Sequence, residues 1–272
     1  MVRTIIALLF CFPVALYAQT YQQLSERAIE CIEKDSLPKA EELLLQALKL
    51  EPKNAKNALL FSNLGLVQRR LGEFDKALES YSFALNFAPL AVPILLDRAA
   101  IYMEMGKTDR AYTDYCQVLD EDKQNKEALL MRAYIYVLRR DYPAARIDYN
   151  RLLELDPQSY SGRLGLATLE QKEGKFRESL EILNKMITAT PDDATLYIAR
   201  ADVEREMKHE DLALVDLEEA IRLNPSSADA YLLRGNIYLT QKKKALAKMD
   251  FEKAISLGIP PADLHEQLKQ CK

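Results

Sequence analysis

The sequence predicts an all-α fold in which short helix-turn-helix units stack into a solenoid. Similar residues recur every 34 positions over most of the chain. Within one period, apolar residues fall twice into the spacing of an amphipathic helix, and a Gly separates the two patterns in several units. The 49% hydrophobic and 29% charged residues are typical of a folded protein rather than a disordered one.

Three columns of residues define the period. Large side chains, mostly aromatic, stand at Tyr81, Tyr115, Tyr149, Leu183, Leu217 and Phe251. A small residue precedes each of them by one helical turn, at Ala77, Ala111, Ala145, Ser179, Ala213 and Ala247. A second small column holds Gly65, Ala99, Ala133, Ala167, Ala201 and Gly235. Small residues on facing helices let the two backbones approach closely, and the larger column fills the space beside them.

Each unit is expected to contain two helices joined by a turn. In the second unit, the first helix has an inner face made of Phe61, Leu64, Gly65 and Gln68. Gly72 ends that helix, because Gly adopts a left-handed backbone freely, and the second helix ends before Pro89. Arg140, Lys208 and Lys242 replace the turn Gly in other units, which puts the turn geometry there in doubt.

The order of a small residue, a Gly turn, an Ala, an aromatic residue, an Ala and a closing Pro resembles the tetratricopeptide repeat family. The match defines seven repeats: 21–54, 58–91, 92–125, 126–159, 160–193, 194–227 and 228–261. The resemblance implies a right-handed superhelical solenoid over residues 19–261. Residues 262–272 should then form a short capping helix or tail, with Leu264 and Leu268 covering the last repeat.

The first residues do not follow the repeat and read as a signal peptide, residues 1–18. Arg3 precedes an apolar stretch from Ile5 to about Leu16, and Ala18 provides a small residue at the expected cleavage site. The stretch is too short for a spanning helix, which needs roughly 20 apolar residues. We therefore expect export, and analogy with exported family members places the protein in the periplasm or cell envelope of a Gram-negative bacterium.

Two charged columns occur in the same four repeats. The arginines are Arg98, Arg132, Arg200 and Arg234, and the aspartates that follow them are Asp114, Asp148, Asp216 and Asp250. The second and fifth repeats lack both charges and carry Leu64 with Ser80 and Leu166 with Ile182. Antiparallel helices would bring the two columns together. We expect structural ion pairs between first and second helices, within a repeat or to its neighbour.

The fourth repeat opens with an apolar helix, and this is where a binding site is expected. In the family, first helices line a concave groove that holds a partner peptide. By register, the candidate groove residues are Leu96, Met103, Leu130, Tyr134, Val137 and Leu164, with Ala100 and Thr168 on the same lining. The alternative is that these side chains pack against neighbouring first helices and form core.

Other classes of function find little support in the sequence. A net charge of −4 and a pI of about 5.5 give no basic footprint for nucleic acid. The carboxylate clamp that binds chaperone tails in this family needs Lys and Asn four positions apart, and pairs such as Leu130 and Tyr134 do not match it. His209 and His265 are the only histidines and have no metal-ligand spacing.

These observations predict no enzyme, no cofactor and no metal site. The function they favour is a non-catalytic protein–protein interaction scaffold of the cell envelope, which binds a partner peptide or helix in its concave groove. The alternative is a self-associating structural scaffold with no foreign partner, which would use the ends of the array or the groove to form a homodimer or larger assembly.

Overall fold

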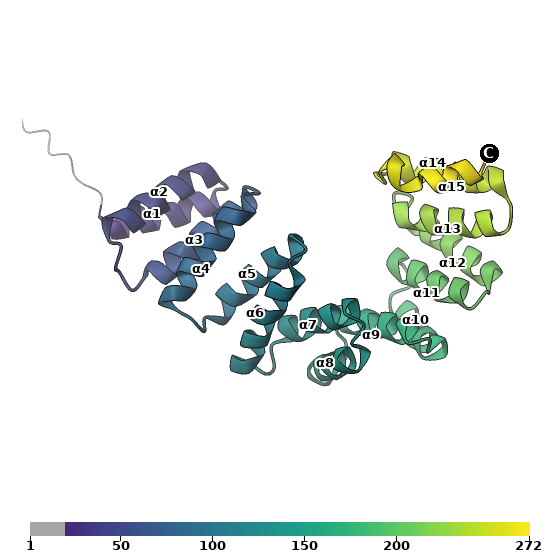
Figure 1. The fold of residues 1–272 in the computed structure, drawn as a ribbon, viewed down its shortest axis with the longest axis horizontal. Coiled ribbons are helices and arrows are strands. Elements are labelled where there is room, and N and C mark those ends of the chain that lie inside the picture. The colour runs from purple at the N-terminus through teal and green to yellow at the C-terminus, as the bar shows by residue number, and fades with distance from the viewer. Residues whose placement is uncertain (1–19) are drawn as a thin grey trace, which may run out of the picture. The chain divides into compact units, whose positions relative to one another are not determined.

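A computed structural model describes residues 20–272, and this part of the chain is all-α, with tandem helix pairs and no strand (Figure 1). The all-α repeat architecture expected from the sequence is confirmed. The predicted signal peptide, residues 1–18, lies outside the described residues. No helix among the described residues is both long and apolar enough to cross a membrane.

The helices fall into two compact units, and the chain divides between them after Asp122. The first unit contains α1 (Tyr21–Glu33), α2 (Leu37–Leu50), α3 (Asn57–Arg70), α4 (Phe74–Phe87), α5 (Val92–Glu104) and α6 (Thr108–Glu121). Each of the three predicted repeats in this unit holds one helix pair, and α3 begins one residue ahead of its repeat. Lys123 stands where other repeats close with a Pro.

The second unit contains four further helix pairs and a short C-terminal segment. Its elements are α7 (Lys126–Leu138), α8 (Tyr142–Leu155), α9 (Tyr160–Lys172), α10 (Phe176–Ala189), α11 (Ala194–Glu206), α12 (Glu210–Leu223), α13 (Ala228–Thr240), α14 (Lys244–Ser256), a 3-10 turn (Pro261–Leu264) and α15 (His265–Gln270). Each helix packs on its partner in the repeat, and the second helices α8, α10 and α12 also pack on the first helix of the next repeat. Consecutive first helices such as α7 and α9 are also in contact.

The repeating columns form the core in both units. The Ala that precedes each large residue is fully buried, and Tyr81, Tyr115 and Phe251 are among the largest side chains removed from solvent. The facing small residue is needed for this packing, since a Cβ at Gly65 would lie 2.9 Å from the ring atoms of Tyr81. Burial of each such side chain contributes about 1.5–3 kcal/mol. One helix pair cannot bury all of its apolar faces alone, so each pair depends on its stacked neighbours.

The turn within each repeat keeps one geometry even where Gly is absent. Gly72 has φ of +78°, and Arg140, Lys208 and Lys242 have φ of 60°, 68° and 60°. The closing hydrogen bond is kept as well, because the Asp141 amide donates to the Tyr136 carbonyl at 2.9 Å. The doubt raised by these substitutions is resolved in favour of the left-handed turn, which costs a residue other than Gly roughly 1–2 kcal/mol.

The C-terminal segment divides into the 3-10 turn and α15 rather than one helix. Leu264 is buried between them and packs in a cluster with Phe251 and Ala254 of α14, with Leu268 partly buried beside it. The segment therefore covers apolar surface on the last repeat, which is the role of a terminal cap in repeat proteins.

Candidate functional site

The structure brings the two charged columns together within each repeat. Every arginine lies on a first helix, and its aspartate lies on the second helix of the same repeat. The shortest nitrogen–oxygen distances are 2.7 Å for Arg98–Asp114, 2.7 Å for Arg132–Asp148, 2.6 Å for Arg200–Asp216 and 2.8 Å for Arg234–Asp250. Each pair is bidentate, with Nε and Nη2 donating to the two carboxylate oxygens.

These charges serve the fold. The four carboxylates are buried, and each guanidinium also lies within 6 Å of a tyrosine ring, as Arg200 does over Tyr197 at 5.6 Å. Hydrogen bonds to Asp216 raise the pKa of Arg200 above its ordinary value. With both oxygens of each aspartate engaged, the pairs link first to second helices and offer little to a ligand.

Four of the six predicted groove residues line one cavity in the second unit. Leu130, Tyr134 and Val137 of α7 face Leu164 of α9 across a space of about 380 Å³. The rest of the lining is Met131, Tyr149, Ser161, Gly165 and Thr168. Leu130 and Val137 also pack partly against the core of the fourth repeat. One part of each side chain therefore lines the cavity, as predicted for the groove, and another part is buried as core, as in the alternative.

Two of the lining residues, Tyr149 and Gly165, pack against each other and were not assigned to the groove by sequence reasoning. Tyr149 on α8 is 3% exposed, and burial, with a smaller effect of Tyr134, raises its pKa to about 12. Its ring lies against Gly165, where a Cβ would stand 2.5 Å from Cε1. The sequence could have indicated this packing, because the equivalent position carries a side chain in every other repeat.

The lining continues along the first helices of the later repeats. Leu164 and Thr168 also border a second cavity of about 440 Å³, whose other walls come from α9, α11 and α13. Here the lining is more polar, with Asp202 accepting a hydrogen bond from Gln171 at 2.8 Å and pairing with Arg205. The lining formed by the first helices of this unit thus changes from apolar at α7 to mixed polar at α11.

The remaining two predicted groove residues lie in the first unit. Leu96 and Met103 are on α5 and are both partly buried. They are therefore not members of the cavity lined by α7, α8 and α9.

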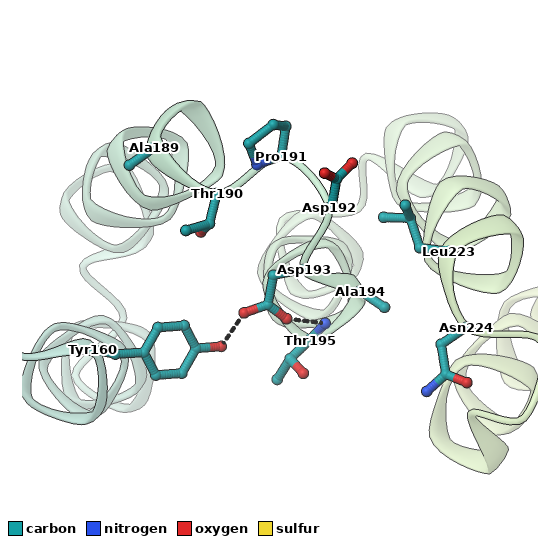
Figure 2. Close-up of a pocket in the computed structure, with 10 residues that line it drawn as sticks. All are labelled: Tyr160, Ala189, Thr190, Pro191, Asp192, Asp193, Ala194, Thr195, Leu223 and Asn224. Carbon is teal, nitrogen blue, oxygen red and sulfur yellow. Dashed lines mark hydrogen bonds between the residues drawn. The ribbon is translucent and has the colours of Figure 1, made fainter.

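A further cavity, of about 730 Å³, lies where helices end and begin rather than on the first-helix lining (Figure 2). Figure 2 shows Tyr160 directed at Asp193, and the Tyr160 hydroxyl donates to Oδ2 at 2.6 Å. The other oxygen, Oδ1, accepts from the Thr195 amide at 2.9 Å and so caps α11. Burial and this contact raise the pKa of Tyr160 to about 12. The Asp193 carboxylate is therefore engaged by the fold.

The histidines make local contacts. His209 Nδ1 lies 2.7 Å from Oε2 of Glu204, and His265 Nδ1 lies 3.2 Å from Oε1 of Glu266. Within residues 20–272, no three His, Cys, Asp or Glu side chains are arranged to hold a metal ion. The cavity between α7 and α9 is therefore the candidate site, and its chemistry is apolar contact.

Comparisons with known proteins agree with the architecture. Residues 96–160 and 228–257 match family models described as tetratricopeptide repeat. The comparison with curated proteins gives no significant match.

Solved structures provide the strongest relationship. A tetratricopeptide repeat protein from Parabacteroides merdae ATCC 43184 is 37% identical, with a TM-score of 0.85 over 93% of this chain and 99% of that chain. The pilF protein of Pseudomonas aeruginosa is 16% identical, with a TM-score of 0.60 over 77% of this chain and 94% of that one. A chain of the Cut9–Hcn1 hetero-tetramer of the APC/C is 12% identical, with a TM-score of 0.65 over 92% of this chain and 55% of that one. The last two share the fold alone.

Identity of 37% over almost the full length of both chains goes well beyond a shared fold. Proteins built from these repeats generally act as scaffolds that bind protein or peptide partners. The repeat columns, the helix pairs and this relative together establish that the chain belongs to the tetratricopeptide repeat family.

Proposed function

We propose that this protein is a non-catalytic interaction scaffold of the cell envelope, and that it holds an extended peptide segment of a partner protein through an apolar side chain. The observation that carries the proposal is the cavity between α7 and α9, which four predicted groove residues line. Its volume of about 380 Å³ falls within the range of ligand pockets, roughly 300–1,000 Å³.

The chemistry of the lining selects the partner. Leu130, Val137 and Leu164 offer aliphatic contact, and Tyr134, which is 46% exposed, offers a ring at the rim. Burial of one Leu or Phe side chain contributes about 1.5–3 kcal/mol, which is roughly a tenfold to hundredfold gain in affinity. The more polar cavity at α9 to α13 then gives backbone and polar side chains of the same segment groups to bind.

The proposed location rests on the sequence of residues 1–18, with its single Arg, its short apolar stretch and Ala18. Export would deliver a chain that begins at Gln19. Expression of the full gene product in a Gram-negative host, followed by fractionation and N-terminal sequencing, tests this. An intact Met1 in the cytoplasmic fraction would refute export.

The binding test uses a random 12-residue peptide library displayed on phage, selected against purified residues 19–272. Enriched peptides are then synthesised, and their Kd values are measured for the wild type, for the double variant Leu130→Glu with Tyr134→Ser, and for Ile147→Glu. Ile147 is the matched control, because it is an apolar residue on α8 that is 69% exposed and outside the cavity.

We expect enriched peptides to share a bulky apolar residue and to bind the double variant at least tenfold more weakly, with affinity unchanged in Ile147→Glu. Equal affinity for all three proteins would contradict the proposed site. If no peptide is enriched and light scattering shows a stable oligomer at low concentration, the proposal gives way to self-association.

A further inference from the structure

The second helices of the last two repeats carry large apolar side chains on their outer surface. These are Leu212 and Val215 on α12 and Leu246 and Met249 on α14, and they are between 44% and 65% exposed. The two residues of each pair are three positions apart, so their side chains lie on one face of the helix. We call these four residues the outer apolar patch.

The repeat register shows that this surface differs from the rest of the chain. The pair on α14 follows the pair on α12 by one period of 34 residues. The equivalent pairs of the first five repeats are Lys39 with Glu42, Lys76 with Glu79, Arg110 with Thr113, Ala144 with Ile147, and Glu178 with Glu181. In the first repeat, Lys39 and Glu42 form a solvent-exposed ion pair at 2.7 Å. The fold therefore leaves these two positions in water, and large apolar residues at both of them indicate a surface that a partner covers.

The two apolar pairs lie on neighbouring helices. α12 and α14 are the second helices of adjacent repeats, and α13 packs on both of them (Figure 1). Leu212 and Gln241, the residue that caps the end of α13, line one cavity of about 600 Å³, so the start of α12 lies beside the turn that leads into α14. Because equivalent residues of stacked repeats point to the same side of the array, the patch forms one surface.

Charges of opposite sign flank the two halves of the patch. Apart from Asp216, which pairs with Arg200, α12 carries four acidic residues and one arginine. α14 and the turn before it carry five lysines, and their acidic residues are Glu252 and Asp250, of which the second pairs with Arg234. One helix of the patch is therefore acidic and the other is basic, so the surface is complementary to a second copy of itself.

We propose that the outer apolar patch joins two copies of this chain in a symmetric dimer, with α12 of each copy against α14 of the other. A two-fold axis that runs parallel to the helices, between α12 and α14, gives this arrangement and sets equivalent repeat positions opposite each other. Val215 then faces Met249 of the second copy, and Glu219 faces Lys253 of the second copy. An axis across the helices would instead place the acidic α12 on the acidic α12 of the second copy, which is unfavourable.

An anionic lipid surface matches the patch less well than a second copy does. The lysines of α14 would attract such a surface, whereas the acidic residues of α12 would be repelled by it. The dimer also differs from association through an array end or through the peptide cavity, because the patch consists of second helices and leaves the first-helix cavities accessible. Dimer formation and peptide binding can therefore be tested separately.

The test measures the monomer–dimer equilibrium of purified residues 19–272 by sedimentation velocity, at loading concentrations from about 1 μM to about 100 μM. The double variant Val215→Asp with Met249→Asp removes apolar contacts from both helices. Ile147→Asp is the matched control, because Ile147 stands at the repeat position of Val215 and is 69% exposed but lies on α8, outside the patch. We expect a dimer that dissociates on dilution, a Kd at least about tenfold weaker for the double variant, the wild-type Kd for the control, and unchanged circular dichroism in all three.

Charge reversal tests which helices face each other. Glu219→Lys and Lys253→Glu each place like charges opposite each other in the proposed dimer, so each should weaken it by about threefold or more. The variant that carries both reversals restores opposite charges and should return the Kd to within about twofold of the wild type.

Three results would overturn the proposal. The chain stays monomeric up to about 100 μM, the dimer survives Val215→Asp with Met249→Asp, or both single charge reversals leave its Kd unchanged. Co-sedimentation of a monomeric chain with vesicles that contain phosphatidylglycerol would then assign the patch to an anionic lipid surface.

Discussion

Replacement of one buried ion pair by the residues of a neighbouring repeat should leave stability almost unchanged, whereas either single replacement should be costly. The pair is Arg200–Asp216, and the replacements are Arg200→Leu and Asp216→Ile. The fifth repeat carries Leu166 and Ile182 at the same two positions, so the chain itself shows that apolar residues fit there.

The magnitudes follow from the exposure of the two side chains. The Asp216 side chain is 9% exposed and that of Arg200 24%. Removal of one partner of a buried pair costs about 3–5 kcal/mol, because the other charge stays buried and unpaired. Arg200→Leu strands the better-buried charge and should cost about 3–4 kcal/mol. Asp216→Ile leaves a guanidinium that water and Asn184 reach, at Nη1 to Oδ1 2.6 Å, and should cost about 2–3 kcal/mol.

The double variant should unfold within about 1 kcal/mol of the wild type, since it removes both desolvated charges. Urea unfolding followed by circular dichroism gives the total, and hydrogen exchange of the α11 and α12 amides gives the local value, which is needed because repeat arrays depart from two-state unfolding. Single variants that each cost less than about 0.5 kcal/mol and add to the double would refute the reasoning, because they would show a pair as weak as a surface salt bridge.

Three further predictions concern the cavity and the turns. Gly165→Ala places a Cβ 2.5 Å from the Tyr149 ring, so it should destabilise the protein by about 1–3 kcal/mol in urea unfolding and weaken peptide binding; an unchanged midpoint would show that the ring can move. Lys208→Gly relieves a left-handed backbone with φ of 68° and should add about 0.5–1 kcal/mol to the free energy of unfolding, measured by thermal unfolding. The gain is smaller than the full backbone strain because Gly is more flexible in the unfolded chain, and a lower Tm would contradict this prediction. Tyr149 has a folded pKa of about 12 against roughly 10 when unfolded, so the folded state keeps its proton longer and stability falls as pH rises through that window. At pH 11 the wild type should lose about 1.4 kcal/mol relative to Tyr149→Phe, and parallel pH profiles for the two proteins would be evidence against a buried phenol.

The sequence was a good guide wherever a contact repeats. The Arg–Asp pairs could be anticipated because both residues recur with one period, and antiparallel helices bring such columns side by side. The small and aromatic columns could be placed in the core for the same reason. A residue type that recurs at the same position of several repeats indicates a contact that those repeats share.

Contacts that occur once gave no such signal. Arg146 on α8 pairs with Glu170 of α9 and with Glu173, which follows α9, and the residues at the same position of the neighbouring repeats, Tyr112 and Leu180, give no hint of this contact. The wall that Tyr149 gives the apolar cavity likewise depends on the single absence of a Cβ at Gly165.

The placement of both members of each ion pair inside one repeat has a consequence for how the chain can change length. Loss or duplication of a complete repeat, such as 194–227, removes or adds a balanced pair, so every buried pair on either side of the new junction stays complete. A crossover between Arg200 and Asp216 that imports the second helix of the fifth repeat would instead strand a guanidinium opposite Ile182. The charge pattern therefore favours exchange at the loops between repeats and disfavours it at the turn inside one.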